Sequence, residues 1–180
     1  MPYTPPATLR PVPMNLLLAR HLWGYPGAWE DLFSRIKARG YGAIEAVIPA
    51  PEDRRRFRDL LDAHGLAYIA QVFTEGTTVD EHVASFCTQL GDAATLDPLL
   101  VNSHSGRDAW SDDEAATFFA EALRIEADHA APVAHETHRM RVFYAPWSTA
   151  RMLDHFDGLR VCCDFSHWVT VCERLLDDQQ

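Results

Sequence analysis

Three short segments in the second half of the sequence combine histidine with acidic or basic residues, each directly after an apolar run. They are Asn102–Asp108 (NSHSGRD), His135–Arg139 (HETHR) and Asp164–Trp168 (DFSHW), and they hold four of the nine histidines. Carboxylate oxygens suit divalent ions such as Mg²⁺ or Mn²⁺, and a nearby histidine can orient a substrate hydroxyl or carry a proton. These residue types therefore predict metal-assisted chemistry.

The spacing within these segments indicates which residues could form a metal site. Glu136 and His138 are two residues apart, so they share a face if they lie on a strand. Asp164 ends an apolar run, and His167 follows three residues later, after a turn into a helix. Alone, Asp164 could simply cap that helix. Because the residues occur together at successive strand ends, we expect Glu136, Asp164 and His167 in one site, with the two carboxyl groups within about 6 Å.

Other chemistries fit less well. The HETH segment is not the zinc-protease HExxH motif, which needs histidines four apart on a helix. A Cys–His nucleophile pair is disfavoured because Cys162 and Cys163 sit within an apolar run. The cysteines form no CxxC pair, and we expect them to be buried in a reducing compartment. We expect four of the other five histidines to lie at the surface of helices or helix ends: His64, His82, His129 and His155.

The elements that position these residues follow from hydrophobic patterning. Short apolar runs alternate with amphipathic runs, which predicts a parallel sheet covered by helices. The expected strands are Met14–Ala19, Ala43–Ile48, Ala67–Phe73, Leu99–Asn102, Pro132–His135 and Leu159–Cys163. The expected helices include Pro26–Arg39, Thr149–Phe156 and His167–Leu176, with Cys87 on the inner face of a helix that begins near Asp80.

Six successive βα units fit either a doubly wound sheet or most of a (β/α)8 barrel. No GxGxxG or GxxxxGK[ST] motif occurs, which disfavours the nucleotide-binding versions of the sheet. In both architectures function lies at the carboxyl ends of the strands. Glu45, inside the run Ala43–Ile48, is a weaker site candidate, since a strand-end glutamate is often only a solvated charge.

Composition bounds the function class. The chain has 180 residues, 47% of them hydrophobic, which fits one globular domain, expected over residues 14–180 after an extended, proline-rich leader at 1–13. The net charge of −10 argues against a protein that binds nucleic-acid phosphates over a broad surface. The sequence has no apolar run of membrane-spanning length and no apolar signal core, so we expect a cytoplasmic protein.

The motifs HETHR and DFSHW resemble those of the xylose-isomerase-like TIM barrels, which include sugar isomerases and epimerases, hydroxypyruvate isomerase, inosose dehydratases and endonuclease IV. The segments Asn102–Trp110 and Ala43–Pro49 are similar to those of proteins of the sugar phosphate isomerase/epimerase type. The resemblance covers residues 14–178 and implies a TIM-barrel fold. It also implies isomerisation or epimerisation of a small hydroxy-carbonyl compound, such as a sugar or sugar phosphate, through an enediolate.

The resemblance also implies residue roles. Glu136 would bind a divalent ion (Mn²⁺, Mg²⁺, Co²⁺ or Zn²⁺) and move a proton, Asp164 would be the second metal ligand, and His167 would contact substrate. The resemblance places a further set of residues at the substrate: His104, His138, Arg139 and Glu45.

The sequence departs from the family at its end. Strands seven and eight of the family barrels supply a histidine ligand and a second catalytic glutamate, whereas this chain stops after the sixth unit. We therefore expect a (β/α)8 barrel truncated to about six units, open edges that could pair in a homodimer, weak metal binding and poor turnover. The alternative is a catalytically inactive barrel, serving as a binding protein or a gene fragment. A phosphodiesterase like endonuclease IV is disfavoured by the negative charge.

Overall fold

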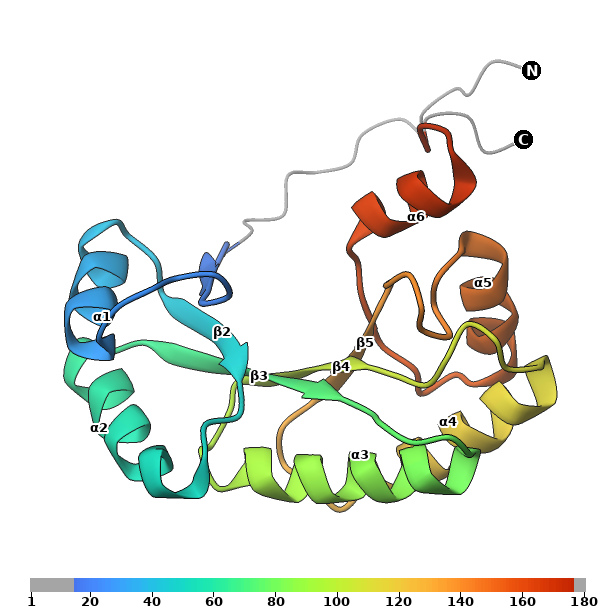
Figure 1. The fold of residues 1–180 in the computed structure, drawn as a ribbon, viewed down its shortest axis with the longest axis horizontal. Helices are drawn as coiled ribbons and strands as arrows, with labels where there is room; N and C mark the ends of the chain where they lie inside the picture. Colours follow the sequence, from blue (N-terminus) through green and yellow to red (C-terminus); the bar gives the residue numbers. More distant parts are fainter. Residues whose placement is uncertain (1–14, 177–180) are drawn as a thin grey trace.

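The computed structural model describes residues 15–176, and the expected leader lies outside them. One sheet of six parallel strands runs in the order β1-β2-β3-β4-β5-β6. This order confirms six βα units of a (β/α)8 barrel, curved into an open half-barrel with helices on its outer side (Figure 1). A doubly wound sheet is excluded. The strands are β1 (Ala19–His21), β2 (Ala43–Val47), β3 (Ala67–Phe73), β4 (Leu100–His104), β5 (Val133–Glu136) and β6 (Val161–Cys162).

The first strand begins later than predicted. The apolar run predicts Met14–Ala19, but the ladder pairs Ala19–His21 with residues of β2, and Leu16, Leu17 and Leu18 are exposed. β1 and β6 are the edges of the described sheet, so β1 has a pairing partner on one side only. The homodimer through these edges stays a prediction.

The helices begin and end where capping chemistry directs. α3 and α4 each open with a capping box, formed by Thr78 with Glu81 and by Ser111 with Glu114. α5 begins earlier than predicted because Pro146 suits the first helical turn. The helices are α1 (Trp29–Ala38), the 3-10 turn η1 (Pro51–Asp53), α2 (Arg54–His64), α3 (Val79–Ala94), α4 (Asp112–Glu126), α5 (Pro146–His155) and α6 (Phe165–Cys172).

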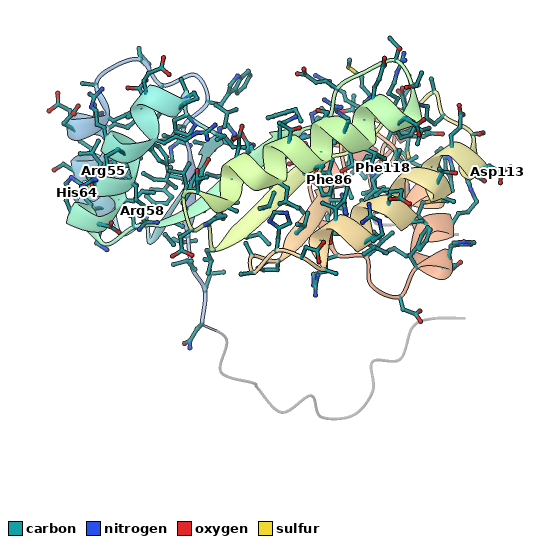
Figure 2. The ribbon with its side chains drawn as sticks, turned by 90° about the horizontal axis from the view of Figure 1, so that it is seen from below. Arg55, Arg58, His64, Phe86, Asp113 and Phe118 are labelled. Atoms are coloured by element: carbon teal, nitrogen blue, oxygen red, sulfur yellow. The ribbon has the colours of Figure 1, made fainter. Side chains whose placement is uncertain are left out.

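The core lies between the outer face of the sheet and the helices. Its largest fully buried side chains are mainly aromatic, and Phe86 of α3 meets Phe118 of α4 with ring centroids 6.0 Å apart (Figure 2). This packed layer holds the strands in register, so the carboxyl ends of the strands meet at one edge. Within residues 15–176, no helix is long and apolar enough to cross a membrane.

Two sequence-based expectations of burial are wrong. His82 is only 2% exposed, because Nδ1 lies 2.8 Å from Thr74 Oγ1 and the ring packs edge-on against Trp110. Cys87 is exposed, since Phe86 and Leu90 occupy the inward face of α3 and place their neighbour toward solvent. Cys163 is exposed as well, whereas Cys162 and Cys172 are partly buried.

Candidate functional site

The strand ends bring the predicted ligands together. Glu136 is the last residue of β5, Asp164 follows β6, and His167 lies in the first turn of α6. One ligand atom from each of these three residues lies within 4.8 Å of the other two. The two carboxyl groups therefore meet the predicted separation. Asp164 also caps α6, because its Oδ1 accepts a 2.9 Å hydrogen bond from the Ser166 backbone N–H, so capping and ligand geometry coexist in one side chain.

A second group shares Glu136. Ligand atoms of His104, Glu136 and His138 also lie within 4.8 Å of one another. The imidazoles form a row, with centroids 4.9 Å apart for His104 and His138, and 3.9 Å for His138 and His167. His104 stacks on Phe73 at 4.1 Å. Burial, aided by the positive charges nearby, lowers the pKa of His104 to about 3, so this ring is neutral at ordinary pH.

Glu136 occupies an environment suited to proton transfer. It is 8% exposed, and His104 Nε2 lies 3.1 Å from its Oε2. Burial raises the pKa of Glu136 to about 7; the Asn102 hydrogen bond opposes this rise, and the negative charges of Glu45 and Asp164 add to it. A carboxyl group with a pKa near the working pH can both take up and release a proton.

A chain of hydrogen bonds along the inner face holds the carboxylates. Asn102 Nδ2 donates both to Glu136 Oε2 and, over 2.8 Å, to Glu45 Oε1. Gln71 Nε2 donates to the same Glu45 oxygen over 3.2 Å, and Gln71 Oε1 lies 3.0 Å from His21 Nε2. Sequence reasoning did not assign Asn102 or Gln71 to the site. Their signal is a buried amide inside an apolar strand, and Asn102 is two residues from His104 and so shares its face.

Arg139 is the predicted site residue whose side chain the structure does not bring to the cluster. Its side chain is exposed, and the contact that joins it to the site is made by its backbone carbonyl, which meets His138 Nδ1. The arginine that reaches across the strand ends is Arg141, two residues further on, whose Nη1 donates to the carbonyl oxygens of Thr74 and Gly106.

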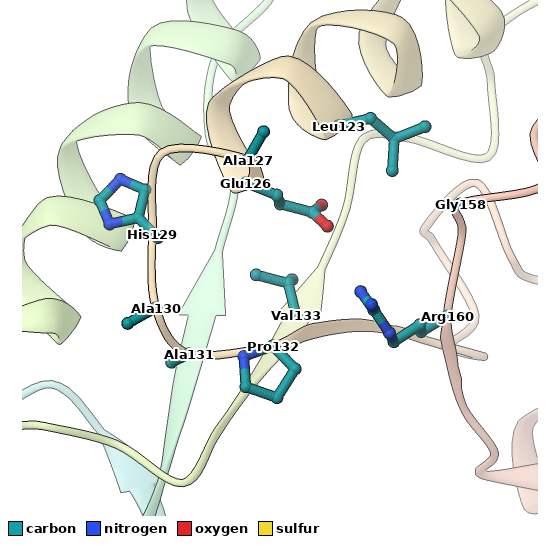
Figure 3. Close-up of a pocket in the computed structure, with 10 residues that line it drawn as sticks. All are labelled: Leu123, Glu126, Ala127, His129, Ala130, Ala131, Pro132, Val133, Gly158 and Arg160. Atoms are coloured by element: carbon teal, nitrogen blue, oxygen red, sulfur yellow. The ribbon is translucent and has the colours of Figure 1, made fainter.

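The donor set fits a divalent ion. Two carboxylates and an imidazole, converging within 4.8 Å, are the ligand types that Mn²⁺, Mg²⁺ and Zn²⁺ accept. The site lies on the inner face of the open half-barrel. A cavity of about 360 Å³, lined by Glu126, Val133 and Arg160 among others, lies at the opposite end of β5 (Figure 3) and is separate from this chemistry.

Comparison with known proteins bears on the family. The family model described as xylose isomerase-like TIM barrel matches residues 33–179. This chain belongs to that family. No curated protein sequence matches the chain significantly.

Solved structures share the fold of this family member at low identity. The probable 3-DHS dehydratase AsbF of Bacillus anthracis, involved in petrobactin synthesis, has a TM-score of 0.67 at 15% identity, with 86% of this chain and 65% of that chain covered. The E. coli 3-keto-D-glucoside 4-epimerase YcjR has a TM-score of 0.66 at 12% identity, with 92% of this chain and 72% of that chain covered. The IOLI protein with a bound zinc atom has a TM-score of 0.67 at 14% identity, with 85% of this chain and 64% of that chain covered. The chain thus spans less than two thirds of the length of the dehydratase.

Proposed function

We propose that this chain is a metal-dependent isomerase or epimerase of the xylose isomerase-like family, acting on a small hydroxy-carbonyl compound such as a sugar or sugar phosphate. The observation that carries the proposal is the convergence of Glu136, Asp164 and His167 within 4.8 Å at the strand ends. The fold supports it, since TIM barrels place their reactive groups at this edge. The epimerase and zinc-bound structures with the same fold agree with it.

Glu136 and Asp164 would hold the divalent ion, with the imidazole of His167 beside them. The ion would act as a Lewis acid on the carbonyl and adjacent hydroxyl oxygens of the substrate. Glu136 would remove the proton from the carbon next to the carbonyl and return it to the neighbouring carbon or to the other face. Asn102 donates a hydrogen bond to Glu136 and would keep its carboxyl in place, with the neutral ring of His104 beside it. His138 and His167, next in the row of imidazoles, would orient substrate hydroxyls.

The test combines metal binding with a general assay of proton transfer. Mn²⁺ is titrated calorimetrically into the protein, and solvent deuterium incorporation into a panel of aldoses, ketoses and their phosphates is followed by NMR. We expect weak Mn²⁺ binding, because two carboxylates, even with an imidazole beside them, leave much of an octahedral shell to water or substrate. We expect slow exchange that requires both Mn²⁺ and Glu136.

The matched control is Glu126→Gln, a glutamate on the other side of the sheet that does not face the cluster. Exchange that survives Glu136→Gln would contradict the proposal. Mn²⁺ binding without exchange on any member of the panel would instead support the inactive barrel that serves as a binding protein.

A further inference from the structure

Residues 15–176 contain fourteen arginines. Six form ion pairs with carboxylates, and all six belong to α2, α4 or α5: Arg54, Arg55, Arg56, Arg58, Arg124 and Arg151. Arg141 is one of the eight that form none. It is half-buried in the segment between β5 and α5, and no carboxylate of the described residues lies within ion-pair distance of it. Its partners are two backbone carbonyl oxygens.

Those two carbonyls fix the position of the guanidinium. Arg141 Nη1 donates to Thr74 O over 2.8 Å and to Gly106 O over 3.2 Å, so its side chain spans the segments that follow β3 and β4. The backbone next to Arg141 is fixed as well, since Val142 N–H donates to Ser105 O over 3.1 Å. The guanidinium is therefore held across the carboxyl ends of the strands, at the edge of the sheet where Glu136 lies.

The hydrogen bonds leave one edge of the guanidinium free. Nη1 donates to both carbonyls, and no acceptor among residues 15–176 binds Nε or Nη2. Nε–H and Nη2–H point the same way and form the side-on edge, which binds both oxygens of a carboxylate or phosphate in parallel hydrogen bonds. The carbonyl contacts thus orient an edge suited to bidentate oxyanion binding, which has no hydrogen-bond partner among the described residues.

The charges around Arg141 also favour the binding of an anion. Burial lowers the pKa of Arg141, and only the more distant carboxylates of Glu75 and Asp108 counter this effect. A half-buried cation without an anionic partner is unfavourable, and a bound anion offsets that cost.

We infer that Arg141 binds an oxyanion of the substrate, a carboxylate or a phosphate, through its Nε–Nη2 edge. The inference rests on the proposed function and narrows it: the substrate is an anionic hydroxy-carbonyl compound whose reacting carbons lie at Glu136 and whose charged group lies at Arg141. Neutral sugars would lack this contact.

The binding experiment needs neither metal nor turnover. The ¹⁵N-labelled chain is titrated with inorganic phosphate, with glycolate as a small hydroxycarboxylate, and with glycerol as the uncharged control, while the Nε–H resonance of Arg141 is followed by NMR. We expect that resonance to shift and saturate with at least one anion and not with glycerol. The anion that binds more tightly tells phosphate from carboxylate.

Arg141→Lys keeps the charge and a donor for the carbonyls but removes the side-on edge. We expect it to weaken anion binding about tenfold, as the loss of a charge-assisted hydrogen bond does. Arg39→Gln is the matched control and should bind like the unmodified chain, because Arg39 is exposed at the end of α1 and forms no ion pair within residues 15–176. Thermal unfolding of each variant checks the fold, and the titration of the unmodified chain does not depend on any variant.

The inference is overturned if neither anion shifts the Arg141 resonance, or if Arg141→Lys binds both anions as tightly as the unmodified chain. Anion binding at Arg141 together with an absence of metal-dependent exchange would leave the anion site standing and would contradict the proposed function alone. Exchange that depends on Glu136, without anion binding at Arg141, would support the proposed function and contradict the anion site.

Discussion

His135 and Glu136 are neighbours on β5 and face opposite sides of the sheet. His135 points outward and is 1% exposed, between Ser105 Oγ, 2.6 Å from Nδ1, and Glu126 Oε1, 3.0 Å from Nε2. Phe86, Phe119 and Phe143 surround its ring. Glu136 points inward, is nearly as buried, and shares its surroundings with two other carboxylates.

The difference shows that burial alone does not make a reactive group. Both ring nitrogens of His135 have partners, so this histidine joins a closed polar network inside an aromatic shell and stabilises the fold. Glu136 is held by Asn102 while the acids near it oppose its ionisation, which is an arrangement found at functional sites. The outer face of β5 should therefore govern stability, and the inner face should govern chemistry.

The largest expected effect is on catalysis at the inner face. Glu136→Gln should lower the rate of metal-dependent deuterium exchange by about 10²–10⁴-fold, because a positioned acid–base group contributes about this much. Glu126→Gln, on the outer network, should change the rate by less than about threefold, since it touches no reacting group. Equal losses in the two variants would show that the two faces are not separate.

The next effect is on stability at the outer face. His135→Leu should lower the free energy of unfolding by about 1–3 kcal/mol, because Ser105 and Glu126 lose their buried hydrogen-bond partner. Glu136→Gln should leave the free energy of unfolding unchanged or raise it, as it removes a buried charge. Urea unfolding followed by circular dichroism measures both. A larger loss in Glu136→Gln than in His135→Leu would reverse the comparison.

A smaller effect is on the pH dependence of stability without metal. The pKa of Glu136 is about 7 in the folded chain against an ordinary 4.5. The protonated carboxyl therefore stabilises the folded chain. This contribution to the free energy of unfolding is fully present below pH 4.5 and is lost as the pH rises through 7. Allowing for solvent screening, the loss should be about 1–2 kcal/mol.

His104 acts in the opposite sense over part of this range, because its lowered pKa makes stability fall as the pH drops from 6.5 toward 3. The measurement is therefore the difference in unfolding free energy between the unmodified chain and Glu136→Gln, taken from pH 4.5 to 8. A difference that does not change with pH would mean that Glu136 ionises normally.

The smallest effect is the stabilisation by metal. Mn²⁺ at ten times its dissociation constant should raise the free energy of unfolding by about 1.4 kcal/mol. Asp164→Asn should reduce this increment, whereas Asp157→Asn, an exposed aspartate before β6, should retain it. Because Asp164 also caps α6, the comparison uses the Mn²⁺-dependent increment of each variant and not its absolute stability. An unreduced increment in Asp164→Asn would remove this residue from the metal site.

The sequence predicts those parts of the fold and site that depend on contiguous residues. The strands β2 to β6 and the grouping of Glu136 with Asp164 and His167 follow from apolar runs and from polar residues directly after them. The sequential strand order follows only from the family resemblance, because six βα units also fit a doubly wound sheet. His82 and Cys87 were misplaced because a shift of one residue turns a helical side chain by about 100°, which decides between core and solvent.

Other site residues depend on which strands and loops meet in space. The bridge from Glu45 through Asn102 to Glu136 joins three strands whose register the sequence does not display. The orientation of Arg141 depends on two carbonyls contributed by the segments after β3 and β4. The sequence favours Arg139 because it belongs to the HETHR motif, but the turn that follows it gives the interior position to Arg141.

The sequential strand order has a consequence for how the chain folds. Each strand pairs with the strand that precedes it, so successive contacts join segments separated by a single helix and the entropy lost in closing each loop is small. The sheet can then grow from its first units outward as the chain leaves the ribosome, each new βα unit adding to an edge that is already formed. The site at β5 and β6 is assembled late in this sequence, on a scaffold that β2 to β4 have by then completed.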